Sequence, residues 1–166
     1  MSNRIVSLPF AMALSFASTC TFAAPTPTLE RVVLAGDWAG AVREAAKDQS
    51  PDGSVRYLAG HGYLALDRGN EAVCMFIGAA GISGQEVWLS WTAGLTERQP
   101  SSPIAHFLHG DALARLGAWP AARGELDRAL KLRPGDPLIW NARASARAAS
   151  GDWLGARSDL DAASAD

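Results

Sequence analysis

The stretch from Pro103 to Ala163 contains one pattern twice, PIAHFLHGDALARLGAWPAARGELDRALKLRPGD and then PLIWNARASARAASGDWLGARSDLDAA. Gly117-Ala118-Trp119 in the first copy returns as Gly151-Asp152-Trp153, 34 residues later. A glycine readily ends a helix in the left-handed conformation. A proline cannot continue a helix, so Pro134 stops the one before it. The pattern therefore predicts two helix–turn–helix hairpins, over 103–136 and 137–166.

Two less regular copies precede these. Gly36-Asp37-Trp38 fits the turn of a hairpin over about 24–54, and Gly69-Asn70 fits the turn of another over 55–102. Successive turn glycines are then 33, 48 and 34 residues apart. The interval of 48 is about 14 residues longer than one repeat. We place this surplus at 70–83 as an apolar insertion in the second hairpin. Residues 85–98 are then expected to be that hairpin's second helix.

A period of about 34 with small, aromatic and proline residues at these spacings resembles the tetratricopeptide repeat. The resemblance implies an all-α, helix–turn–helix repeat solenoid of about four hairpins, stabilised by stacking of neighbouring hairpins. It also implies a protein that binds another protein. Small residues at 110, 122, 144 and 156 would let helices approach closely. We expect Trp119 and Trp153 to be buried between hairpins.

In this family the first helices of the hairpins line a concave groove that holds a segment of a partner. Transferred by register, the resemblance places Arg56, Tyr63, Phe107, Asp111 and Asn141 on that groove. The expected first helices contain no lysine, which argues against the family's clamp for a C-terminal carboxylate. Aromatic residues beside polar ones would suit an extended or helical segment with apolar anchors.

The expected insertion includes the most apolar run outside the first 23 residues, Ala72–Ile77. Its periodicity does not distinguish a short helix from a buried strand-like segment. Val73, Met75 and Phe76 would either plug the end of the groove or dock the partner. We expect Cys74 to be buried in this run rather than reactive.

Residues 1–23 have the pattern of a cleaved signal peptide. Arg4 gives a positive start, an apolar run covers 5–17, and Thr21-Phe22-Ala23 offers small residues for cleavage after Ala23. The apolar run is too short to span a bilayer. The sequence thus predicts an exported protein, periplasmic or secreted. A lipid anchor at Cys20 is the weaker alternative, because 17–19 resemble a lipobox poorly.

No motif in the chain points to catalysis or to a cofactor. His106 and His109 could face one metal ion, but in the repeat they occupy packing positions and no third ligand is spaced to join them. Gly60-His61-Gly62 lacks the strand and the Lys-Ser/Thr of a phosphate loop. A formal net charge of −2 gives no basic face for nucleic acid. We expect no enzyme, no cofactor and no metal.

The sequence therefore favours a protein–protein interaction or scaffold module at the cell envelope. The alternative is a non-catalytic accessory or lid domain that assists a secreted or periplasmic enzyme. The last repeat has no further helix to cover its outer side. Either that side is polar enough to meet water, or self-association covers it.

Overall fold

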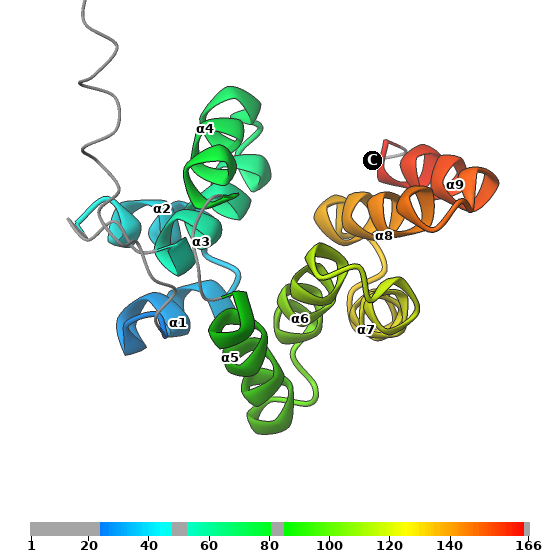
Figure 1. Cartoon of the computed structure of the whole chain (residues 1–166). Coiled ribbons are helices and arrows are strands. Elements are labelled where there is room, and N and C mark those ends of the chain that lie inside the picture. The colour runs from blue at the N-terminus through cyan, green and yellow to red at the C-terminus, as the bar shows by residue number, and fades with distance from the viewer. Residues whose placement is uncertain (1–23, 48–52, 81–84, 165–166) are drawn as a thin grey trace, which may run out of the picture.

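The computed structural model describes residues 24–47, 53–80 and 85–164, with the side chains of 77–80 left undescribed. The signal peptide expected at 1–23 lies outside these residues. The described residues form nine helices and no strands, which confirms the all-α repeat fold (Figure 1). In chain order the helices are α1 (Pro27–Leu34), α2 (Trp38–Ala45), α3 (Gly53–Ala65), α4 (Gly69–Ala80), α5 (Gln85–Arg98), α6 (Pro103–Arg115), α7 (Trp119–Leu132), α8 (Pro137–Ala149) and α9 (Trp153–Ala163).

Eight of these helices pair as antiparallel hairpins. The pairs are α1 with α2, α3 with α4, α6 with α7, and α8 with α9, and α2 and α7 also pack against the first helix of the next hairpin. A small residue lies where α6 closely approaches α7, as predicted. A Cβ added at Gly110 would lie 2.7 Å from the Cγ of Leu126 on α7, so only glycine fits there.

One turn conformation joins the two helices of every hairpin. Gly36, Gly117 and Gly151 adopt φ values of 75°, 76° and 85°, where glycine is favoured. The equivalent residue between α3 and α4 is Asp67, with φ of 56°. The expected turn residue Gly69 is instead the first residue of α4. The predicted register of the second hairpin was therefore wrong by two residues.

Residues 70–80 of the expected insertion at 70–83 are not a surplus segment, and 81–83 lie outside the described residues. Residues Gly69–Ala80 form α4, the second helix of the hairpin that begins with α3. Ala72 is fully buried and Phe76 packs edge-on against Tyr57 of α3, with ring centroids 5.6 Å apart. Gly60 makes this contact feasible, because a Cβ there would lie 2.7 Å from the Phe76 ring. Burial of one face of the apolar run against α3 thus decides its helical conformation.

The additional helix is α5, which was predicted to be the second helix of that hairpin. It packs mainly against α6 instead of α3. Its side chains also reach α1, where Glu30 accepts a hydrogen bond from Trp91 Nε1 at 3.3 Å and pairs with Arg98 at 3.1 Å. Helix α5 therefore joins the first hairpin to the pair formed by α6 and α7.

Two expectations of burial were wrong. Cys74 is exposed, because it lies on the side of α4 that faces away from the residues packed on α3. Trp153 is 70% exposed, whereas Trp38 and Trp119 at the same repeat position are partly buried. Those two residues begin helices that pack against the next hairpin. Within the described residues no helix follows α9 that could pack against Trp153.

Candidate partner-binding groove

A groove of about 670 Å³ opens between the first helices of three hairpins, α3, α6 and α8. Phe76 of α4 and Trp119 at the start of α7 complete its walls. The lining residues are His61, Leu64, Asp67, Phe76, Phe107, Asp111, Ala114, Arg115, Trp119, Leu138, Asn141, Ala142, Ser145, Ala146 and Ala149. Its volume is within the range of about 300–1,000 Å³ usual for ligand pockets, and most of its lining residues are apolar.

The groove brings together three of the five residues predicted to line it. Phe107, Asp111 and Asn141 all contribute to its lining. Arg56 and Tyr63 are partly buried on α3 outside the groove lining. The Tyr63 ring lies under the Arg68 guanidinium, at 4.8 Å from the ring centroid.

The three residues singled out in the expected insertion have different environments. Phe76 lines the groove, and Met75 is partly buried against the core. Val73 is 54% exposed and is not among the lining residues. Phe76 therefore forms part of the groove wall, while Val73 lies on the outer surface of α4.

An aromatic cluster underlies the groove. Phe107 is only 2% exposed, and its ring lies edge-on to His61 with centroids 4.9 Å apart. On its other side, His61 lies edge-on to Phe76 at 5.2 Å. Perpendicular rings of this kind form a rigid apolar surface. The cluster links side chains of α3, α4 and α6 that line the groove.

Arg115 provides the positive charge of the groove. Its guanidinium lies 3.9 Å from the centroid of the Tyr57 ring, and its Nε donates to Asp111 Oδ2 at 2.9 Å. Burial lowers the pKa of Arg115 to about 10, which leaves it protonated at neutral pH. The cation–π contact and the ion pair hold Arg115 and Asp111 in one orientation.

His61 is the main polar residue that sequence reasoning missed. It is 4% exposed, and neither ring nitrogen makes a hydrogen bond within the described residues. Nε2 lies 3.4 Å from Asp111 Oδ2, close enough for an ion pair but poorly aligned for a hydrogen bond. The glycines on either side of His61 were a usable signal. Gly60 packs against Phe76 of α4, and Gly62 packs against Val42 of α2. The residue between them, His61, lines the groove.

The histidines considered for metal binding have separate partners. His106 Nδ1 lies 2.7 Å from Glu125 of α7, and its Nε2 lies 2.9 Å from the Pro100 carbonyl oxygen. His109 Nδ1 lies 3.2 Å from Thr92 Oγ1 on α5. Both histidines therefore occupy helix–helix contacts, as their repeat positions predict. The described residues contain no group of three or more metal-ligating side chains.

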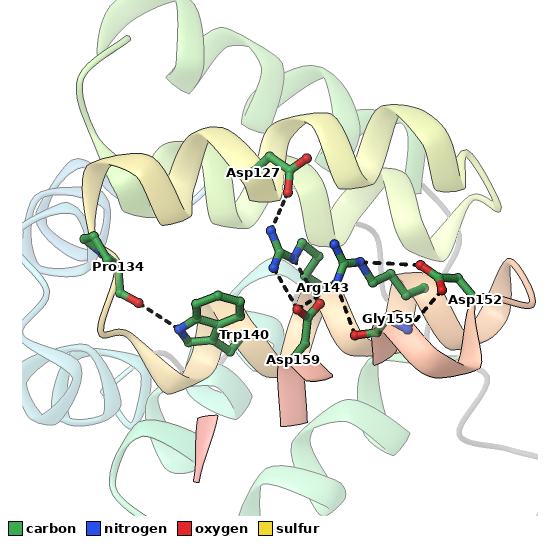
Figure 2. Close-up of polar contacts among 8 residues, drawn as sticks. Asp127, Pro134, Trp140, Arg143, Asp152, Gly155 and Asp159 are labelled. Atoms are coloured by element: carbon green, nitrogen blue, oxygen red, sulfur yellow. Dashed lines mark hydrogen bonds and ion pairs between the residues drawn. The ribbon is translucent and has the colours of Figure 1, made fainter. Parts of the chain in front are cut away.

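Helix α8, one wall of the groove, is also held by a polar network (Figure 2). Arg143 of α8 reaches Asp127 of α7 and Asp159 of α9, and Arg147 also donates to Asp159 at 2.8 Å. Arg147 donates further to the Gly155 carbonyl oxygen at 3.1 Å. These contacts come from three helices, so they determine where α8 places its groove residues.

Comparison with known proteins supports the repeat assignment in part of the chain. Residues 103–146 match the family model described as tetratricopeptide repeat. No curated protein matches the chain. A solved structure of MamA (MSR-1) is 21% identical with a TM-score of 0.46, and the match covers 81% of this chain and 90% of that one. MamA (AMB-1) is 20% identical with a TM-score of 0.46, covering 81% and 85%. These values are too low to inform the function of this chain.

No helix in the described ranges is both long and apolar enough to cross a bilayer.

Proposed function

We propose that this protein is a non-catalytic binding module that holds a segment of another protein in the groove between α3, α6 and α8. The observation that supports this most directly is that three successive first helices line one concave, largely apolar surface. Solenoids of stacked helical repeats commonly bind partners on such surfaces. The match of residues 103–146 to the tetratricopeptide repeat supports the same role.

The lining of the groove indicates how the segment is held. Equivalent positions on the three first helices, six residues before the turn residue, carry His61, Asp111 and Ser145. A polar residue therefore occupies this position on all three helices, and Phe107 and Leu138 line the same groove. An extended or helical segment crossing the helices can place apolar side chains on the aromatic cluster and polar groups near these polar residues.

The test is partner capture with a blocked groove. Ala142→Arg places a long side chain in the groove, whereas Ala121→Arg adds the same side chain at an exposed position on α7 outside the lining. We expect the parent and Ala121→Arg to capture the same proteins from envelope extract, and Ala142→Arg to lose them. Thermal melts would establish that both variants fold. Equal capture by the two variants would exclude the groove as the binding site.

We further propose that the protein acts after export, as residues 1–23 predict. Intact-mass measurement on protein from the native cell would then give a chain beginning at Ala24. A soluble cytoplasmic chain that retains Met1 would contradict export without affecting the groove.

A further inference from the structure

Asp67 occupies a turn position that glycine holds in the other three hairpins. It is the one non-glycine residue with positive φ among the described residues. A side chain in this conformation is strained, although aspartate tolerates it better than most residues. The fold therefore does not need an acid at this position, because glycine performs the same turn elsewhere in the chain.

The Asp67 carboxylate also has no structural partner. Among the described residues it forms neither an ion pair nor a hydrogen bond, although it lines the groove. Aspartates in two other turns cap the next helix. Asp37 accepts from the Gly40 amide at 2.7 Å and Asp152 from the Gly155 amide at 3.0 Å. The neighbouring Arg68 is directed to Glu71, at 2.6 Å, rather than to Asp67.

The end of α3 adds to this negative charge. The carbonyl end of a helix carries a partial negative charge that a basic residue in the last turn offsets. Helix α6 has Arg115 and α8 has Arg147 in that place, but α3 has no basic residue in its last turn. The rim of the groove at Asp67 therefore combines an unpaired carboxylate with the carbonyl end of a helix that has no basic residue in its last turn.

The other charges of the groove do not neutralise this rim. Its lining includes the carboxylates of Asp67 and Asp111 and one guanidinium, that of Arg115, which is already paired with Asp111. Two negative charges and one positive charge leave a net charge of −1. The buried His61 lies beside them, with Nε2 3.4 Å from Asp111 Oδ2.

We propose that the segment held in the groove carries a basic side chain, lysine or arginine, that pairs with Asp67 next to an apolar side chain on Phe76. This inference rests on the proposed function and specifies its partner. Charge complementarity selects the basic residue, and the aromatic cluster selects the apolar one.

The test uses a phage-displayed library of random dodecapeptides selected on the parent protein and on three variants. Asp67→Asn keeps a left-handed-tolerant residue but removes the charge, Asp67→Gly installs the residue of the other turns, and Ala142→Arg blocks the groove. We expect the parent to enrich peptides that carry lysine or arginine near an aromatic or large aliphatic residue. For one enriched synthetic peptide, both Asp67 variants should bind about fivefold more weakly at low salt. Neither variant should melt below the parent, because asparagine and glycine both tolerate the positive φ of this turn.

Each outcome separates this inference from the proposed function. Peptides that lack a basic residue, or that bind both Asp67 variants as tightly as the parent, would overturn the charge assignment. If Ala142→Arg still abolishes their binding, the groove itself is retained. If Ala142→Arg binds like the parent, or if no peptide is enriched, the proposed groove function fails and this inference fails with it.

Discussion

Arg143 of α8 donates to both carboxylate oxygens of Asp159 on α9, with Nε 2.9 Å from Oδ2 and Nη2 2.7 Å from Oδ1 (Figure 2). Such a two-point contact fixes the relative orientation of the two side chains. The hydrogen bonds that Arg143 donates to Asp159 raise the pKa of Arg143 above its ordinary value. Asp159 is 1% exposed, so this pair lies inside the last hairpin rather than on its surface.

Replacement of Asp159 by asparagine should therefore destabilise the protein strongly. Asparagine keeps one acceptor oxygen but carries no charge, so Arg143 and Arg147 would lose their shared buried carboxylate, at a cost of about 3–5 kcal/mol in the free energy of unfolding. Asp127→Asn is the control, because its carboxylate also pairs with Arg143 but is half exposed. That change should cost less than about 1 kcal/mol. Urea denaturation would measure both, and equal losses would contradict a dominant role for the buried pair.

Two glycine substitutions should have opposite effects. A Cβ at Gly110 would lie 2.7 Å from Leu126 Cγ and 3.1 Å from the Ala122 carbonyl oxygen, so Gly110→Ala should destabilise by about 1–3 kcal/mol. Gly124 on α7 has open space around it, and Gly124→Ala should stabilise by about 0.5–1 kcal/mol. Thermal melts of the two variants test this. Stabilisation by both would mean that α6 and α7 are farther apart than described.

The tryptophans at equivalent repeat positions should differ in their contribution to stability. Trp119 is partly buried, so Trp119→Ala should cost about 2 kcal/mol. Trp153 is largely exposed, and Trp153→Ala should cost less than about 0.5 kcal/mol. Chemical denaturation followed by circular dichroism would compare them. A large loss of stability in Trp153→Ala alone would show that the face of α9 around Trp153 is covered in solution.

The pH dependence of stability should report on His109. Burial lowers the pKa of His109 in the folded protein, whereas the unfolded chain has the ordinary value of about 6.5. Below that pH the unfolded state binds a proton that the folded state resists, so stability falls as pH decreases. We expect the Tm to drop between about pH 7.5 and about pH 5.5, and to drop less in His109→Gln. The same slope in both proteins would assign the loss to other groups.

The outer face of α9 should mediate self-association. Leu154 is 86% exposed and lies beside Trp153, with Leu160 half exposed on the same helix. Sedimentation at increasing concentration should show association of the parent, and Leu154→Asp should remain monomeric. A parent that stays monomeric at the highest concentration would indicate that α9 meets water directly.

The repeat fold could be predicted from sequence wherever glycine and tryptophan mark the turn together. They do so at 117–119 and 151–153, and the hairpins there match the expectation. In the second hairpin Asp67 replaces the turn glycine, and Gly69 replaces the tryptophan that begins the next helix. Taking Gly69 as the turn residue therefore shifted the predicted register by two residues. As a result, α4 was predicted to be an insertion.

The same shift explains the groove residues that were missed. Counted back from Gly69, the position equivalent to Asp111 is Tyr63; counted from Asp67, it is His61. On α6 and α8 the register was right, and Phe107, Asp111 and Asn141 line the groove. Exposure of Cys74 and Trp153 could not be predicted, because it depends on which helices lie opposite them. Local patterns in one helix do not contain that information.

The exposed face of α9 that carries Trp153 has a consequence for protein engineering. It repeats the start of α7, a helix that packs against the next hairpin. A copy of 137–163 joined behind Asp166 should thus find a docking surface already in place, and the array could be lengthened one hairpin at a time. Stability in such arrays grows with every added interface. The chain is in this sense a modular building unit, whose length is adjustable without redesign of its groove.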